Sequence, residues 1–326
     1  MELSRKAPPC EAHARHVRPV SLVAAFPGRA SVLRAWFHPR GQALLSEVGF
    51  RLAGAENPLI LVPTHVNGRG PFEFILDTGA GMSLLGPRLA GELGIVSSGA
   101  REGRGAGVRV QVAIARVESL AIGAAKGSAM PVGITADVDR IGAAVGHRIE
   151  GDIGYDFLRA FRLTIDYRRR VVRLAPGGPP GAIEAGGPGG AAHPEVPFRL
   201  AAPAKPLVLV PAFVNGRGPH TFVLDTGASA TVLSPGLAAT LRIETVAAEP
   251  MTGAGGMLQA TLGRAGSLTV GGATLEDVAV RVADSLPDLV SAGDTRLDGI
   301  LGYNFLRHFR VTLDYPGGTL SLMKAV

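Results

Sequence analysis

Residues 59–85 read LILVPTHVNGRGPFEFILDTGAGMSLL, and residues 207–233 read LVLVPAFVNGRGPHTFVLDTGASATVL. The two stretches align without a gap at an offset of 148 residues, and 17 of 27 positions are identical. Residues 151–167 and 299–315 repeat at the same offset, with 11 of 17 positions identical. A duplication of this length indicates that two copies of one structural unit make up most of the chain.

The duplication predicts how the chain is divided. Each repeat is about 125 residues long, which is the size of an ordinary domain. The segment between the repeats is rich in Gly, Pro and Ala and cannot bury a hydrophobic core, so we expect a linker there. The expected parts are an N-terminal extension of targeting or disordered character (1–48), a first lobe (49–174), the linker (175–196) and a second lobe (197–326).

Local signals in both repeats predict an all-β fold. The chain contains 45 Gly and 24 Pro, spread between short runs of Val, Ile and Leu, which is typical of many short strands joined by turns. An Asn-Gly pair, at 67–68 and again at 215–216, suits a tight hairpin that needs positive φ. In the two repeats we expect strands at 59–63, 72–76, 207–211 and 221–224, short helices at 155–161 and 303–309, and closing hairpins at 162–174 and 310–322.

The tripeptide Asp-Thr-Gly follows a hydrophobic strand in each repeat. It occurs as Asp77-Thr78-Gly79 and as Asp225-Thr226-Gly227. One copy is weak evidence, since Asp and Gly are common in turns, but two copies at matching positions of a duplication are strong evidence. Glycine lets the chain turn sharply and lets backbone N–H groups approach the carboxylate. If the repeats pack about a pseudo-two-fold axis, the two carboxyl groups meet.

Two adjacent carboxyl groups predict acid–base chemistry. Like charges at short range prevent both from ionising, so the pair shares one proton and titrates as a unit. The ionised member can take a proton from a water molecule while the protonated member donates to a peptide carbonyl oxygen. This chemistry hydrolyses peptides and needs neither a metal nor an organic cofactor.

The sequence resembles the retropepsin-like aspartic proteases, which have the pepsin fold. The resemblance is carried by residues 76–80 (LDTGA), by residues 224–229 (LDTGAS) and by Ile300-Leu301-Gly302, and it covers about 49–322. It implies two β-barrel lobes related by a pseudo-two-fold axis with the active site between them, as in bacterial single-chain relatives. By this resemblance Asp77 and Asp225 are the catalytic pair, supported by the loop residues Thr78, Gly79, Thr226, Gly227 and Ser229.

Some positions depart from the family pattern. The first lobe has Asp152 where the second has Ile300, and Gly81 where the second has Ser229. The first change places a carboxyl group at an expected apolar position, and the second removes one expected outer hydrogen bond to the pair. Both put the level of activity in question. The expected flap residues, chosen by position within Gly-rich segments, are Gly105, Gly107, Gly253 and Gly255.

Other function classes find little support. The net charge is +6, but the arginines are scattered and aromatic residues make up 5%, which does not predict nucleic-acid binding. The lone Cys10 cannot form an internal disulfide, and the histidines lack metal-ligand spacing. No apolar run is long enough to span a membrane, and the short run 20–26 does not predict a convincing signal peptide. We expect a monomer that binds an extended peptide or protein substrate, in the cytoplasm, the periplasm or outside the cell.

Three functional hypotheses remain open. The first is an aspartic endopeptidase. The second is a catalytically weak peptide-binding module on the same fold, and the third is a scaffold whose aspartates are misaligned. Two further duplicated positions are interpreted as structural: Asp166 and Asp314 as turn residues, and Asp156, aligned with Asn304, as the cap of a helix start.

Overall fold

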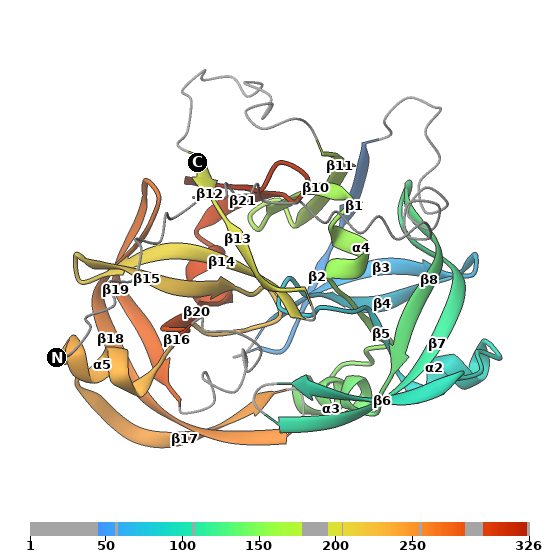
Figure 1. The fold of residues 1–326 in the computed structure, drawn as a ribbon, viewed down its shortest axis with the longest axis horizontal. Helices are drawn as coiled ribbons and strands as arrows, with labels where there is room; N and C mark the ends of the chain where they lie inside the picture. The colour runs from blue at the N-terminus through green and yellow to red at the C-terminus, as the bar shows by residue number, and fades with distance from the viewer. Residues whose placement is uncertain are drawn as a thin grey trace, which may run out of the picture. The chain divides into compact units, whose positions relative to one another are not determined.

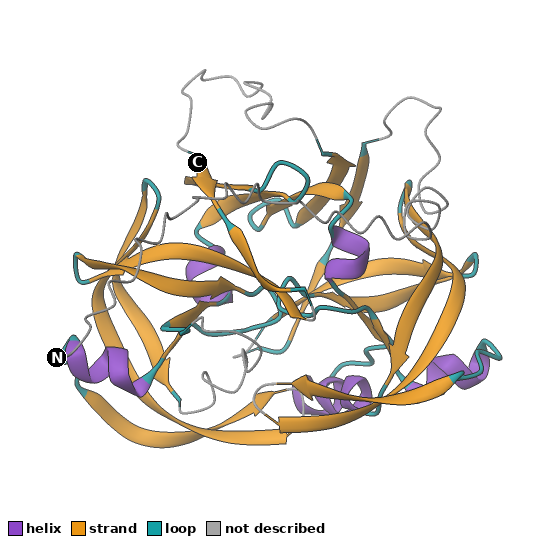
Figure 2. Cartoon of the chain, in the orientation of Figure 1, coloured by secondary structure: helices purple, strands orange, loops and turns teal. Residues whose placement is uncertain are grey.

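The computed structural model describes residues 45–55, 58–105, 108–177, 195–203, 205–253, 256–283 and 296–324. Strands dominate these residues and the helices are short (Figure 2). The prediction of an all-β fold with two similar lobes is confirmed. Within the described ranges, no helix has the length and apolar character needed to cross a membrane.

The first lobe is built on an eight-stranded sheet in the order β2-β3-β4-β9-β5-β8-β7-β6 (Figure 1). Three helices follow β5, β8 and β9 respectively. The strands are β2 (Arg51–Ala53), β3 (Leu59–Val66), β4 (Arg69–Leu76), β5 (Leu84–Leu85), β6 (Gly99–Gly105), β7 (Val108–Ile122), β8 (Ala125–Ile134) and β9 (Gly151–Ile153). The helices are α2 (Pro87–Glu92), α3 (Asp137–Val145) and α4 (Tyr155–Leu158).

The second lobe repeats this plan strand for strand. Its eight-stranded sheet has the order β13-β14-β15-β20-β16-β19-β18-β17. The strands are β13 (Arg199–Ala202), β14 (Lys205–Val214), β15 (Arg217–Leu224), β16 (Val232–Leu233), β17 (Thr245–Gly253), β18 (Gly256–Val270), β19 (Ala273–Val282) and β20 (Gly299–Leu301). The helices are α5 (Pro235–Thr240) and α7 (Tyr303–Leu306). The helices expected at 155–161 and 303–309 are shorter than predicted. They end at Leu158 and Leu306, because the strands β10 and β21 begin at Phe161 and Phe309.

The third sheet joins the two lobes. It has six strands in the order β1-β11-β10-β21-β22-β12, in which β1, β10 and β11 flank the first lobe in the sequence and β12, β21 and β22 flank the second. These strands are β1 (Ser46–Gly49), β10 (Phe161–Asp166), β11 (Val171–Pro176), β12 (Val196–Pro197), β21 (Phe309–Asp314) and β22 (Thr319–Lys324). The closing hairpins expected from the sequence are β10–β11 and β21–β22. Their pairing with each other was not predicted.

The β10–β21 contact at the centre of this sheet holds the lobes together. The strands run antiparallel, and Thr164 lies opposite Thr312 with their hydroxyl oxygens 3.1 Å apart. Arg162 donates from Nε and Nη2 to Asp314 Oδ2 at 2.9 and 2.7 Å. Asp314 Oδ1 also accepts the backbone N–H of Gly317 at 2.9 Å. The turn role expected for Asp314 is therefore present, together with an ion pair across the lobes that the sequence did not indicate.

The Asn-Gly hairpins form as expected. Asn67 and Gly68 have φ values of 50° and 73°, and Asn215 and Gly216 have 53° and 70°. Positive φ at both central residues is the geometry of the tight turn that fits the twist of a hairpin. These turns connect β3 to β4 and β14 to β15, and thereby set the register of the strands that lead into both Asp-Thr-Gly loops.

We expect Gly216→Ala to lower the free energy of unfolding by about 1 kcal/mol, because an alanine at φ 70° is strained. A Cβ there meets nothing within 4 Å, so the cost comes from the backbone alone. Gly91→Ala is the matched control. Gly91 lies in α2 with equally open space around it and no positive φ, so alanine should stabilise by about 0.5–1 kcal/mol. Urea unfolding of both variants checks the two opposite signs.

Candidate active site

The two Asp-Thr-Gly loops lie at the ends of corresponding strands. β4 ends at Leu76 and runs parallel to β9, and β15 ends at Leu224 and runs parallel to β20. The last residues of β4 and β15 are buried, which follows from their apolar sequences. The backbone N–H of Asp77 donates to Ile153 O at 3.0 Å, and that of Asp225 donates to Leu301 O at 3.1 Å. The parallel neighbour therefore fixes where each aspartate leaves its sheet.

Each aspartate is held by its own loop. Gly79 N donates to Asp77 Oδ1 at 2.7 Å, and Gly227 N donates to Asp225 Oδ1 at 2.9 Å. A backbone N–H that points at a carboxylate stabilises its charged form. The glycine of each tripeptide therefore supplies the backbone donor that was expected to approach the carboxylate.

The two carboxyl groups are brought together across the lobes. A Cβ atom on Gly79 would lie 2.5 Å from Cγ of Asp225, and a Cβ on Gly227 would lie 2.5 Å from Cγ of Asp77. Each carboxyl group therefore packs directly against the glycine of the opposite loop. No side chain larger than hydrogen fits at either glycine without moving an aspartate, which explains why both copies of the tripeptide end in Gly.

The threonines interlock between the lobes. Thr78 Oγ1 donates to Leu224 O at 2.8 Å and accepts from Thr226 N at 3.0 Å. Thr226 Oγ1 donates to Leu76 O at 2.6 Å and accepts from Thr78 N at 3.1 Å. Both threonines are 1% exposed, so these four bonds are shielded from water. They fix the distance between the loops and thereby the distance between the aspartates.

Burial and proximity raise the pKa of both carboxyl groups. The pKa of Asp77 is raised from its ordinary value by desolvation, against which the N–H of Gly79 acts. The pKa of Asp225 is raised well above its ordinary value, first by desolvation and then by the charge of Asp77. The two carboxyl groups therefore share one proton and titrate together. Such a pair supplies a base and an acid at the same point.

A layer of polar residues beneath the loops was not predicted. Asp156 Oδ1 accepts from Ser83 N at 2.9 Å and from Ser83 Oγ at 2.6 Å. Asn304 Oδ1 accepts from Thr231 N at 2.7 Å and from Thr231 Oγ1 at 2.8 Å. The signal in the sequence was that a hydroxyl at 83 and 231 and a side-chain carbonyl oxygen at 156 and 304 are kept in both copies.

The interpretation of Asp156 and Asn304 as helix caps is wrong. The helices α4 and α7 begin after Gly154 and Gly302, and neither start has a side-chain cap. The side chains at 156 and 304 instead bind the segments at 83 and 231. Asp156 Oδ1 also accepts the N–H of Phe157 in α4 at 2.9 Å, so this carboxyl group binds a distant segment in addition to a local one.

Aromatic side chains also cross between the lobes near the paired aspartates. Tyr155 lies edge-on to Tyr315 with ring centroids 5.8 Å apart, and Tyr167 lies edge-on to Tyr303 at 5.7 Å. Desolvation raises the pKa of the Tyr315 hydroxyl, and the charges of Asp77 and Asp225 raise it further. The edge-to-face arrangement adds to the packing that holds the lobes in one position.

The remaining predicted site residues have varied outcomes. Ser229 lies on the second loop at the position that corresponds to Gly81, and a Cβ on Gly81 would lie 3.2 Å from Cδ of Pro206. Gly105 ends β6 and Gly253 ends β17, each in a hairpin with the following strand. Gly107 and Gly255 lie outside the described residues. The flap role of these glycines stays a prediction.

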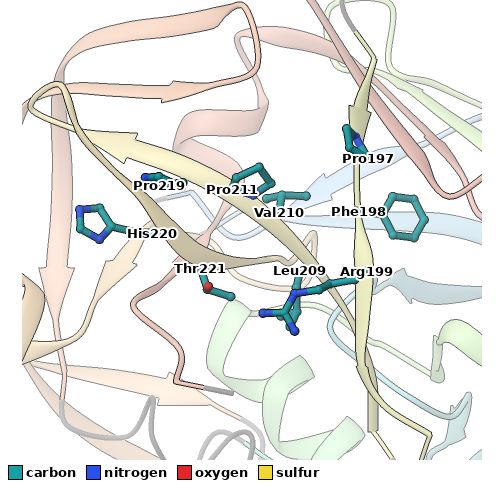
Figure 3. A pocket seen from close by; sticks show the side chains of 9 residues that line it. All are labelled: Pro197, Phe198, Arg199, Leu209, Val210, Pro211, Pro219, His220 and Thr221. Atoms are coloured by element: carbon teal, nitrogen blue, oxygen red, sulfur yellow. The ribbon is translucent and has the colours of Figure 1, made fainter. Parts of the chain in front are cut away.

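A separate hollow of about 330 Å³ lies on the second lobe (Figure 3). It is lined by residues 197–199, 209–211 and 219–221, which belong to β12–β15 and the turns beside them. None of these residues belongs to an Asp-Thr-Gly loop. The hollow is therefore distinct from the paired aspartates, and the candidate active site rests on the loops.

Comparison with known proteins agrees with this geometry. The family model described as Aspartyl protease matches the chain twice, over residues 62–157 and 210–305. The two matches are offset by the same 148 residues as the internal repeat, and each includes one Asp-Thr-Gly loop. No curated protein sequence matches the chain significantly. The two matches together cover more than half of the residues, and the chain therefore belongs to the aspartyl protease family.

Proposed function

We propose that this protein is an aspartic endopeptidase whose catalytic residues are Asp77 and Asp225. The observation that carries the proposal is the contact of each carboxyl group with the glycine of the opposite loop, which places the two groups side by side. Their raised pKa values, caused first by desolvation, support a pair that shares one proton.

The proposed reaction consumes one water molecule for each peptide bond. The ionised aspartate removes a proton from water as the water oxygen bonds to the scissile carbonyl carbon. The protonated aspartate donates its proton to the carbonyl oxygen, giving a gem-diol. The carbon–nitrogen bond then breaks as one aspartate protonates the amine and the other takes a proton from the diol. The products are a carboxylic acid and an amine, and the pair regains its starting protonation. General acid–base catalysis of this kind contributes about 10²–10⁴-fold for each group.

The expected substrate is an extended segment of peptide. The β6–β7 and β17–β18 hairpins are the candidates for flaps that pair with its backbone, since exposed strands bind peptides through main-chain hydrogen bonds. The same fold without turnover would be a peptide-binding module. Hydrolysis separates the two functions directly.

The test is cleavage of a diverse peptide mixture by the full chain from pH 3 to 8, followed by mass spectrometry. We expect cuts at defined sites, with the rate unchanged by a metal chelator. Asp166→Asn is the matched control for the site variants that the Discussion considers. Asp166 accepts the N–H of Arg169 at 3.0 Å in a hairpin turn, and asparagine keeps that bond. The absence of cleavage at every pH, together with measurable peptide binding, would support the binding module instead.

A further inference from the structure

Asp152 is a buried carboxyl group at the centre of the first lobe. It is the middle residue of β9 and lies opposite Ile75 of β4 and Leu84 of β5. The equivalent residue of β20 is Ile300, which belongs to the hydrophobic core of the second lobe. The exposed fractions are 6% for Asp152 and 8% for Ile300. The first lobe therefore buries a carboxyl group where the second lobe buries an aliphatic side chain.

The surroundings of Asp152 are acidic. Its carboxyl group is in hydrogen-bonding contact with that of Asp77, and the charges of Asp225 and Asp156 also act on it. Glu150, two residues earlier in the chain, is bound by Arg148 at 2.5 Å. Among the described residues, Asp152 Oδ1 is buried and has no hydrogen-bond partner.

Two carboxyl groups in contact require a proton between them, because an ionised carboxylate only accepts hydrogen bonds. Desolvation and the neighbouring acidic charges raise the pKa of Asp152 well above its ordinary value, which favours its protonated form. A hydrogen bond donated to a charged carboxylate favours its charge. Asp77 has this donor beside it, whereas the residue at the corresponding place in the second lobe is Ile300, whose side chain carries no donor.

We propose that Asp152 is a positioning residue whose protonated carboxyl group donates a hydrogen bond to Asp77 and so makes Asp77 the ionised member of the pair. This inference rests on the proposed function and assigns its two roles. Asp77 takes the proton from the attacking water, and Asp225 gives its proton to the carbonyl oxygen. Asp152 keeps its own proton throughout, so the three carboxyl groups hold two protons and one negative charge in the resting enzyme.

Two substitutions separate the hydrogen bond from the shape of the side chain. Asp152→Asn retains a donor toward Asp77 but does not titrate, and Asp152→Ile installs the residue of the second lobe and removes the donor. We expect the acid limb of kcat/KM to stay in place for the Asn variant. For the Ile variant the acid limb should move to higher pH by about one unit. The Asp77 carboxylate loses its hydrogen-bond donor in this variant, and its pKa therefore rises. The loss in the Ile variant should fall mainly on kcat, with KM little changed.

Ile300→Val is the matched control for a packing effect at the equivalent place in the second lobe. It should leave the acid limb unmoved. If Asp152→Ile lowers the rate but keeps the wild-type acid limb, the role of Asp152 is structural and the proposal fails. Coincident profiles for the wild type and both Asp152 variants would also overturn it.

A second measurement does not depend on catalysis. Because the folded pKa of Asp152 is raised, its protonated form stabilises the native state. This contribution to stability is fully present below the pKa that Asp152 has in the unfolded chain, about 4. It is lost as the pH rises through the pKa of Asp152 in the folded protein. Relative to Asp152→Asn, the unfolding equilibrium constant of the wild type should rise by up to about tenfold per pH unit above pH 4.

Urea unfolding of the full chain at pH 3 to 8 gives the ratio of the unfolding equilibrium constant of the wild type to that of Asp152→Asn. A ratio that stays constant over the range means that Asp152 ionises normally, and it would overturn the proposal. A ratio that rises while the wild type cuts no peptide would refute the proposed hydrolysis and keep the contact between Asp152 and Asp77. Failure of the two proposals is therefore distinguishable.

Discussion

Asp77→Asn and Asp225→Asn are each expected to lower kcat by about 10³–10⁴-fold while the protein stays folded. Asparagine at 77 cannot take the proton of water, and asparagine at 225 cannot give a proton to the carbonyl oxygen. The amide oxygen can still accept the N–H of Gly79 or Gly227, so the loop retains its internal hydrogen bond. Loss of either group disables the whole pair, so the double variant should be little worse than either single one.

The measurement is turnover of a peptide identified in the cleavage mixture, with circular dichroism and thermal unfolding for each variant. Asp166→Asn should retain the wild-type rate because its carboxyl group lies in a hairpin turn of the shared sheet. A dyad variant that keeps a tenth of the wild-type kcat would contradict the assignment. A variant that is inactive because it is unfolded is recognised by its lost thermal transition.

Thr78→Val and Thr226→Val should each lower the free energy of unfolding by about 2–4 kcal/mol. Valine has nearly the shape of threonine but removes the hydroxyl. Thr78→Val leaves Leu224 O and the N–H of Thr226 without their cross-lobe partners, and Thr226→Val does the same to Leu76 O and the N–H of Thr78. Each unpaired buried group costs about 1–3 kcal/mol. Activity should fall as well, because the interlock sets the separation of the aspartates.

Urea unfolding checks the size of this effect, and two controls define its cause. Thr78→Ser keeps the hydroxyl and should retain most of the stability. Thr240→Val removes a hydroxyl that bonds Gly236 O at 2.8 Å on the exposed side of α5, so its effect should stay within about 0.5 kcal/mol. A cost for Thr78→Val no larger than that for Thr240→Val would mean that the interlock contributes little to stability.

The pseudo-symmetry of the fold is broken at a few positions, and these bear on function. Both lobes supply an aspartate, a threonine and a glycine in the same geometry. Asp152 and Ile300 differ, and so do Gly81 and Ser229. Two equal aspartates would share their proton evenly, but catalysis needs one base and one acid at the same moment. A substitution in one lobe is sufficient to favour one of the two arrangements.

Local sequence determined the parts of the molecule that depend on neighbours in the chain. The Asn-Gly pairs formed tight turns because asparagine and glycine tolerate positive φ, and the apolar runs before both Asp-Thr-Gly loops formed strands. The duplication itself predicted two lobes with the same order of elements. The paired Asp-Thr-Gly loops were found in this way, because the pattern was repeated at a constant offset.

Tertiary structure alone decided which distant groups meet. The pairing of β10 with β21, the contact of Asp152 with Asp77 and the bonds from Ser83 to Asp156 join segments about 70 to 150 residues apart. Nothing local specifies such partners, since they depend on how the sheets pack and in which register parallel strands align. The sequence named Asp152 only as a carboxyl group at an apolar position. Its neighbour became known once β9 lay beside β4, because that register places Asp152 opposite Ile75, two residues before Asp77.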